Sequence, residues 1–180
     1  VTVAEGAVAA DRFGALRPER GLPTEVRFDI EGAPPDFPPA EPTPDDLRMP
    51  TKLARAIAPL VRAWTEGADT PEKKVEAIAS HLRTDFRYSL DYKRSPGDPL
   101  LDFLGENRLG HCEYFASAMA MLARAVDVPS RVVAGYRVAE HNDLGDYDVV
   151  REKNAHAWTE VYIQGKGWQI IDATPEDLLL

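Results

Sequence analysis

The sequence contains one cysteine among 180 residues, so no disulfide can form within the chain. This absence does not assign a redox compartment, because disulfide-free domains occur on both sides of a membrane. A single cysteine in a chain with four histidines is a pattern typical of a catalytic thiol. Cys112 is therefore the first candidate for a functional residue, and a buried structural cysteine is the alternative.

Long apolar runs and a surplus of basic residues are also missing. No run approaches the ~20 apolar residues that a membrane helix needs, and the first residues lack the basic and apolar segments of a signal peptide. Asp and Glu total 30 against 21 Lys and Arg, which gives a formal charge of −9. Nucleic acids and anionic lipid surfaces attract basic patches, so we expect neither of them as a partner.

Prolines concentrate near the N-terminus, where seven of the 15 fall between Pro34 and Pro50. Proline fixes φ and removes a hydrogen-bond donor, so this stretch is expected to be extended and irregular. Residues 1–50 are therefore predicted to be an N-terminal extension with a proline-rich connector. The chain is 44% hydrophobic and 28% charged, which is a globular composition, and residues 51–180 are predicted to form one domain.

The order of the predicted elements is helices first and strands afterwards. Apolar residues recur at helical spacing over residues 51–64, over residues 71–82 behind a Thr70 N-cap, and over residues 112–126. Period-two patterns follow and predict three strands, at residues 131–138, 156–163 and 168–172. This order predicts an α+β domain in which helices pack on an antiparallel β-sheet.

Cys112 stands at the predicted start of the third helix, directly after Gly110 and His111. The first backbone N–H groups of a helix have no partner within the helix, and the helix dipole favours negative charge there. Both effects stabilise a thiolate, which is the nucleophilic form of cysteine. Gly110 would allow a sharp entry into the helix and a close approach of substrate backbone.

Two further residues could complete a nucleophile site. His156 begins a strand of the sheet that is expected to pack on the cysteine helix, and a histidine is a suitable base for a thiol. Asp172 ends an otherwise apolar strand, where it could accept a hydrogen bond from His156 and fix its tautomer. The alternatives are a structural histidine and a carboxylate that caps a turn.

The hairpin between the last two strands decides whether this pair can form. A regular two-residue turn at Gly165 and Lys166 would place His156 and Asp172 on opposite faces of the sheet. A three- or five-residue loop, or a glycine bulge, would place Asp172 opposite Trp158 and on the same face as His156. We therefore predict such a loop or bulge.

Five segments together resemble the transglutaminase-like superfamily. They are residues 110–118 (GHCEYFASA), 123–124, 128–136, 156–162 (HAWTEVY) and 167–174 (GWQIIDAT), in the family's order of cysteine, histidine and aspartate. The resemblance covers residues 51–175 and is closest to the catalytic domain of bacterial membrane-anchored members. Asp127 stands where the family often has glycine, and Ala173 where it often has proline, but neither belongs to the triad.

The resemblance implies a papain-like fold in which residues 51–180 are the catalytic domain and no cofactor is needed. Cys112 would be the nucleophile, His156 the base and Asp172 the residue that orients the histidine. The thiolate would attack a peptide or glutamine amide and form a thioester, which an amine or water then resolves. The alternative is a non-catalytic protein-binding or scaffold domain that retains the fold.

The resemblance also implies a location and further site residues. Members of the bacterial group hold this domain outside the cytoplasm, with a membrane anchor elsewhere in the protein; a soluble cytoplasmic protein is the alternative. The backbone N–H of Cys112 would form part of the oxyanion hole, with Tyr88 as a second donor unless it is a core tyrosine. His111 and Trp158 are expected in the substrate cleft, with a solvent-exposed position as the alternative for His111.

No metal site is expected. The remaining histidines lack zinc-ligand spacing, and the acidic stretch after His141 lacks the spaced ligands and final Glu of a calcium loop. Residues 141–152 are predicted instead to be an exposed, poorly ordered loop beside the substrate groove.

Overall fold

The computed structural model describes residues 41–91, 96–138 and 140–175, together with four short strands nearer the N-terminus. The chain separates into two compact units, Val1–Glu41 and Pro42–Leu180. In the first unit, antiparallel pairs form between β1 and β4 (Thr2–Val3, Phe28–Asp29) and between β2 and β3 (Val8–Ala10, Leu16–Pro18). Every candidate site residue belongs to the second unit. Residues 34–40 of the predicted proline-rich connector lie outside the described residues, and Pro44–Leu47 form a 3-10 helix where an irregular stretch was expected. The predicted domain boundary at residue 50 stays a prediction.

The second unit begins with the short 3-10 helix η1 (Pro44–Leu47) and continues into a layer of helices. These are α1 (Thr51–Trp64), α2 (Pro71–Asp85), α3 (Pro99–Asp102) with the π-helical turn η2 (Phe103–Asn107), and α4 (Cys112–Arg124). The Thr70 side chain accepts a hydrogen bond from the Lys73 N–H, as expected of an N-cap. The three predicted helices are confirmed.

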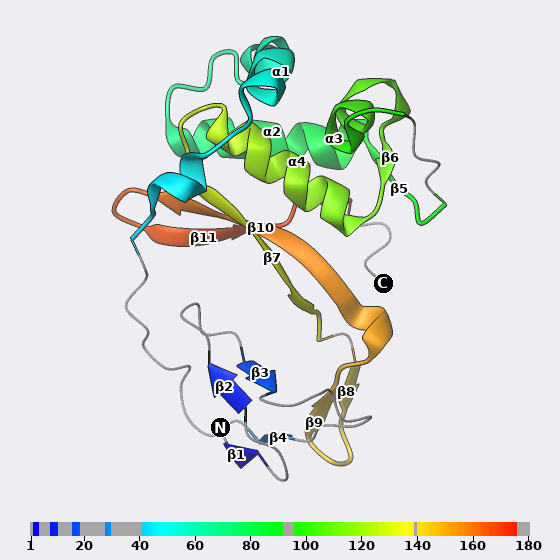
Figure 1. Cartoon of the computed structure of the whole chain (residues 1–180). Coiled ribbons are helices and arrows are strands. Elements are labelled where there is room, and N and C mark those ends of the chain that lie inside the picture. The colour runs from blue at the N-terminus through cyan, green and yellow to red at the C-terminus, as the bar shows by residue number, and fades with distance from the viewer. Residues whose placement is uncertain are drawn as a thin grey trace. The chain divides into compact units, whose positions relative to one another are not determined.

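The helices cover one face of a three-stranded antiparallel sheet (Figure 1). Its order is β11 (Gly167–Ile171), β10 (Ala155–Ile163) and β7 (Ser130–Tyr136), with β10 in the centre. The two-residue strands β5 (Arg87–Tyr88) and β6 (Leu109–Gly110) pair in parallel beside the start of α4. The α+β architecture is confirmed. Within the described residues, no helix is both long enough and apolar enough to cross a bilayer.

The α4 helix is the centre of the hydrophobic core. Seven of its residues are buried, and four of the seven are alanines: Phe115, Ala116, Ala118, Met119, Ala120, Leu122 and Ala123. Small side chains allow α4 to lie close to both α2 and the sheet. Two buried hydrogen bonds fix it on the sheet, from Thr159 Oγ1 to Ala116 O and from Ser130 Oγ to Ala120 O, both 2.8 Å.

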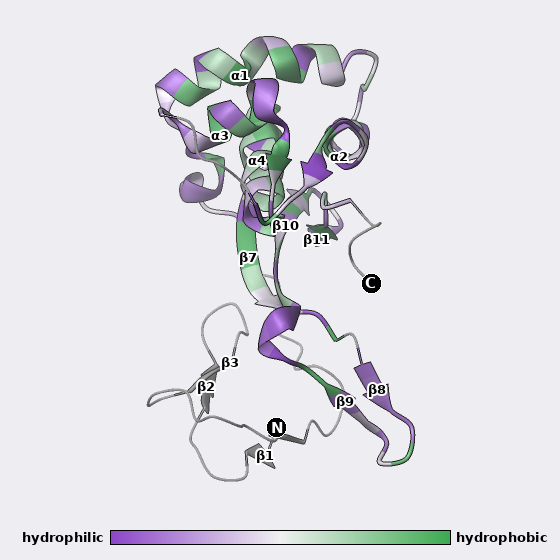
Figure 2. Cartoon of the chain, turned by 90° about the vertical axis from the view of Figure 1, so that its right-hand side faces the viewer, coloured by the Kyte–Doolittle hydropathy of each residue, from purple (hydrophilic) through white to green (hydrophobic). Residues whose placement is uncertain are grey.

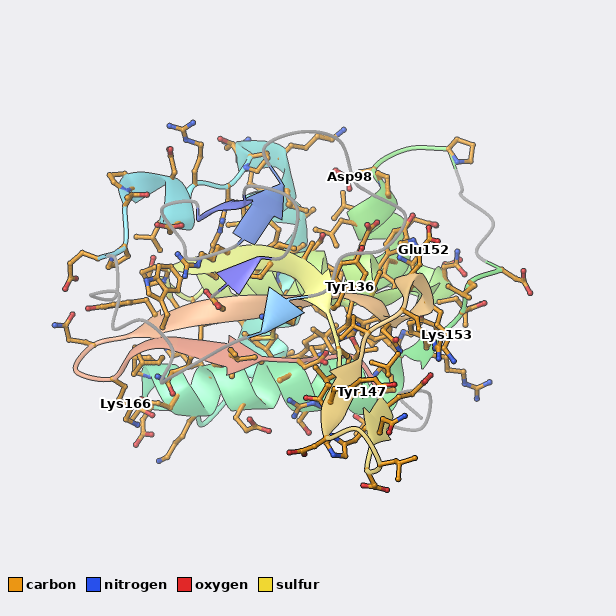
Figure 3. The ribbon with its side chains drawn as sticks, turned by 90° about the horizontal axis from the view of Figure 1, so that it is seen from below. Asp98, Tyr136, Tyr147, Glu152, Lys153 and Lys166 are labelled. Carbon is orange, nitrogen blue, oxygen red and sulfur yellow. The ribbon has the colours of Figure 1, made fainter. Side chains whose placement is uncertain are left out.

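The register prediction for the last hairpin is confirmed. Ile163 pairs with Gly167 and Thr159 with Ile171, so the connection is the three-residue turn 164–166. The Lys166 N–H donates to Ile163 O at 2.9 Å, and the glycines at 165 and 167 both have positive φ, 81° and 74°. Glycine adopts these angles without steric cost. Figure 3 shows Lys166 in this turn, at the opposite end of the sheet from Tyr136.

The acidic segment after β7 forms a regular hairpin, and its prediction as a poorly ordered loop was wrong. Strands β8 (Glu140–Asn142) and β9 (Tyr147–Val149) pair, and η3 (Glu152–Asn154) leads into β10. His141 Nδ1 lies 2.9 Å from Asp148 Oδ1, and the Asn142 side chain accepts hydrogen bonds from two turn N–H groups. Much of the hairpin is exposed and hydrophilic, as predicted (Figure 2).

Asp127, which stands where the family often has glycine, lies in the turn that ends α4. This residue has φ of 62°, in the left-handed region, and the Val128 N–H reaches back to Ala123 O at 3.0 Å. This is the geometry of a Schellman-type helix end, where glycine is the most favourable residue. Asp127 is exposed, so its side chain does not contribute to the core.

We predict that Asp127→Gly stabilises the domain, because a residue with a Cβ is strained in this conformation by about 1 kcal/mol. The melting temperature measured by circular dichroism should rise by roughly 3 °C. Asp127→Ala is the matched control, since it keeps the Cβ, and it should not raise the melting temperature. Equal melting temperatures for the glycine and alanine variants would contradict this account.

Candidate active site

Cys112 is the first residue of α4, as predicted from the sequence. His111 is the N-cap residue with an extended backbone, and its carbonyl accepts the Tyr114 N–H at 2.9 Å. The cysteine is free and half-buried, so it is not sealed in the core. Gly110 is required sterically, because a Cβ at this position would lie 2.8 Å from the Tyr114 Cβ. The chain thus enters the helix sharply and leaves the thiol near the surface.

His156 and Asp172 form a close pair. His156 Nε2 lies 2.7 Å from Asp172 Oδ2, and the histidine side chain is only 7% exposed. The other carboxylate oxygen, Oδ1, accepts the Thr174 N–H at 3.0 Å. The two residues therefore come together as the hairpin register requires, and the carboxylate has a fixed orientation.

The hydrogen bond determines how the imidazole is presented. An ionised carboxylate only accepts, so Nε2 must carry the hydrogen when it bonds to Asp172. In the neutral ring the lone pair is then on Nδ1, which remains able to accept a proton from another group. This is the tautomer that a general base beside a thiol needs.

The His156–Asp172 pair lies beside the helical layer. Thr159 faces α4, and a residue three positions earlier in a flat strand would point to the other side. Asp172, however, follows the last paired residue of β11, and its backbone carbonyl accepts hydrogen bonds from Arg83 of α2. The chain after β11 thus contacts α2 through the Asp172 carbonyl, while the carboxylate of the same residue bonds to His156. The sequence analysis did not single out Arg83.

Tyr88 lies close to the start of α4. Hydrogen bonds on either side of it, from the Arg87 N–H to Arg108 O and from the Ser89 N–H to Gly110 O, align β5 with β6. Burial raises the pKa of the Tyr88 phenol above its ordinary value of 10, and negative charge on Cys112 raises it further. Tyr88 is thus within electrostatic range of the thiol and keeps its proton at neutral pH.

The two expected cleft residues flank these groups. The His111 ring makes an edge contact with Tyr114, at 5.1 Å between centroids, and its side chain is 32% exposed. The Trp158 ring stacks beside His156 at 6.2 Å and lies across Gly135, where a Cβ would be 2.8 Å from the indole. Its buried N–H has no hydrogen-bond partner in the described part of the chain.

Other features do not add to the site. Among the described residues, no three His, Cys, Asp or Glu side chains are arranged to hold a metal ion. A shallow hollow of about 660 Å³ lies elsewhere, against η1, the start of α1 and the second half of α4, where it is lined by Met121 and Arg124. Neither Cys112 nor His156 lines this hollow, so chemistry and not cavity size identifies the candidate site.

Comparisons with known proteins find relatives over about two thirds of this chain. A protein-glutamine gamma-glutamyltransferase of Pseudomonas aeruginosa is 37% identical over 122 residues, which are 67% of this chain and 18% of that protein. The protein YebA of Bacillus subtilis is 31% identical over 137 residues, 71% of this chain and 18% of its own length. The chain thus spans less than a fifth of these relatives.

Solved structures show the same fold. The periplasmic domain of TgpA from Pseudomonas aeruginosa superposes with a TM-score of 0.62 and 35% identity, over 71% of this chain and 45% of that one. A proposed cysteine protease from Cytophaga hutchinsonii gives a TM-score of 0.54 and 26% identity, over 72% of this chain and 41% of that one. The predicted papain-like α+β fold is confirmed.

A family model matches most of the second unit of this chain. Residues 58–173, which include Cys112, His156 and Asp172, match the model of the transglutaminase-like superfamily core. The chain belongs to the transglutaminase-like superfamily.

Proposed function

We propose that this domain catalyses acyl transfer or hydrolysis on a peptide or glutamine amide, with Cys112 as nucleophile, His156 as base and Asp172 as the residue that orients the histidine. The observation that carries the proposal is the 2.7 Å bond between His156 Nε2 and Asp172 Oδ2. It leaves Nδ1 as the basic nitrogen of a histidine on the strand against which the cysteine helix packs. The proposal requires Cys112 Sγ within about 4 Å of that nitrogen.

The position of α4 on the sheet supports this requirement. Ala116 is bonded to Thr159, and Ala120 to Ser130, which pairs with Val161. Four residues of helix advance by about 6 Å and two residues of strand by about 6.6 Å, so the two elements keep step. One further step of four residues toward the helix start brings Cys112 level with position 157, next to His156.

The proposed reaction has two halves. The Cys112 thiolate attacks the amide carbon and forms a C–S bond, while the carbonyl oxygen becomes an oxyanion. The C–N bond then breaks, and the imidazolium of His156 donates its proton to the departing ammonia or amine. In the second half His156 takes a proton from an incoming amine or water, which attacks the thioester and releases the thiolate.

The oxyanion needs hydrogen-bond donors that are already in place. The backbone N–H of Cys112 is one of the unpaired donors at the start of α4. We propose the phenol of Tyr88 as the second donor, because the pairing of Tyr88 with Gly110 places it beside the start of α4. His111 and Trp158 would border the substrate.

The relatives support a substrate class and a location. One bacterial relative is described as a protein-glutamine gamma-glutamyltransferase, and a related structure is described as a periplasmic domain. We propose a protein or peptide substrate with an amine or water as acceptor. We also propose an extracytoplasmic location in a bacterial protein whose membrane anchor lies outside residues 1–180.

A binding or scaffold domain that has lost catalysis is the second candidate. The two candidates differ in the state of the thiol. An activated Cys112 should react with iodoacetamide well below pH ~8.5, the ordinary pKa of cysteine, whereas an unactivated thiol should react only near or above it.

The proposed roles predict a graded loss of activity. Cys112→Ala should abolish incorporation of a fluorescent primary amine into a glutamine peptide, and Asp172→Asn should lower kcat by about 10²- to 10⁴-fold because it disturbs the His156 tautomer. Mass spectrometry of a trapped acyl-enzyme should place the acyl group on Cys112. The matched control is Asp85→Asn, which changes a second aspartate–histidine pair, 2.8 Å apart, on the exposed side of α2. Full activity of the Cys112→Ala variant would refute Cys112 as the nucleophile.

Tyr88→Phe tests the second oxyanion donor. Removing one such donor should lower kcat by about 10²-fold, with a much smaller change in KM. Alkylation of Cys112 should persist in this variant, since the variant keeps the thiol, its base and the helix end. Unchanged kcat would assign Tyr88 to the core.

A further inference from the structure

We infer that Arg83 is a positioning residue for Asp172. The inference rests on the proposed function, because it assigns Arg83 a role in holding the carboxylate that orients His156. Arg83 Nε and Nη2 donate to the backbone carbonyl oxygen of Asp172 at 3.0 and 2.7 Å. The third guanidinium nitrogen, Nη1, lies 3.2 Å from Glu76 Oε1.

Asp172 needs such a contact because of its place in the sheet. It follows Ile171, the last residue of β11, and β11 is at the edge of the sheet. The strand ladder that fixes the preceding residues therefore ends just before the residue whose position matters most. Arg83 fixes the backbone carbonyl and the Thr174 N–H fixes the carboxylate, so Asp172 is held at both its main chain and its side chain.

Arg83 is itself firmly placed. The residue before it, Leu82, is fully buried, and so are Ile78 and Ala79 one turn earlier. These side chains fix α2 in the core, where it packs on α4, the helix that begins at Cys112. Arg83 thereby ties the strand end that carries Asp172 to the layer that carries the nucleophile.

A guanidinium is well suited to this role. Its planar fork can direct two N–H groups at one oxygen, whereas a lysine ammonium has no fixed donor plane. Arg83→Met removes both hydrogen bonds and keeps much of the side-chain volume. Arg83→Lys keeps the positive charge and loses the fork. Glu76→Gln is the matched control, because it changes the other partner of the same guanidinium at an exposed position.

The experiment uses the 180-residue chain and a glutamine peptide with a primary amine as acceptor. Arg83→Met should lower kcat by about 10- to 100-fold, as expected for misplacement of a catalytic group, while KM changes by less than about threefold. Arg83→Lys should fall between this variant and wild type, and Glu76→Gln should match wild type. The ¹⁵N spectrum of the His156 imidazole should show loss of the single Nε2–H tautomer in Arg83→Met.

Melting temperatures separate positioning from support of the fold. A kcat and an imidazole spectrum equal to wild type in Arg83→Met would overturn the inference, as would a loss of activity that only follows the unfolded fraction. If Arg83→Met does not fold, Arg83→Lys decides, and wild-type kcat in that variant also overturns the inference. Cys112→Ala is measured in parallel: activity without Cys112 refutes the proposed function, whereas Cys112-dependent activity that is insensitive to Arg83 refutes only the role of Arg83.

Discussion

The candidate site depends on one constraint, which is that the turn between β10 and β11 contains an odd number of residues. Side chains alternate along a strand, so one residue more or less in the turn would move Asp172 to the face away from His156. The three-residue turn at 164–166 gives the required register, and two glycines with positive φ make it sterically accessible. The geometry at the site is thus set at the far end of the sheet.

The position of Cys112 depends on a different constraint, which is the close packing of α4. The small residues of α4 let it lie between α2 and the sheet, and two buried hydroxyl-to-carbonyl bonds, one from β10 and one from β7, prevent it from sliding along the sheet. Register along the strand and position along the helix are therefore fixed independently. Arg83 joins the two systems where they meet, at the carbonyl of Asp172.

Much of this arrangement could be predicted from the sequence because it follows from local patterns. The cap at Thr70, the apolar spacing of α4 and the parity of the hairpin are all properties of short segments. The pairing of β5 with β6 could not be predicted, since two-residue strands depend on a partner about twenty residues away. The β8–β9 hairpin was missed because its polar sequence lacks alternation, and the contact of Arg83 with Asp172 because Arg83 looks like any charged residue on a helix surface.

The contrast between α4 and β11 has a consequence for local opening of the fold. Amides in the buried middle of α4 should exchange with solvent only through global unfolding, whereas those at the end of an edge strand can exchange through small, local fluctuations. Cys112 and Asp172 thus belong to regions of different cooperativity. On heating or in denaturant, His156 would lose its carboxylate partner while the cysteine helix is still folded. Inactivation would therefore precede global unfolding.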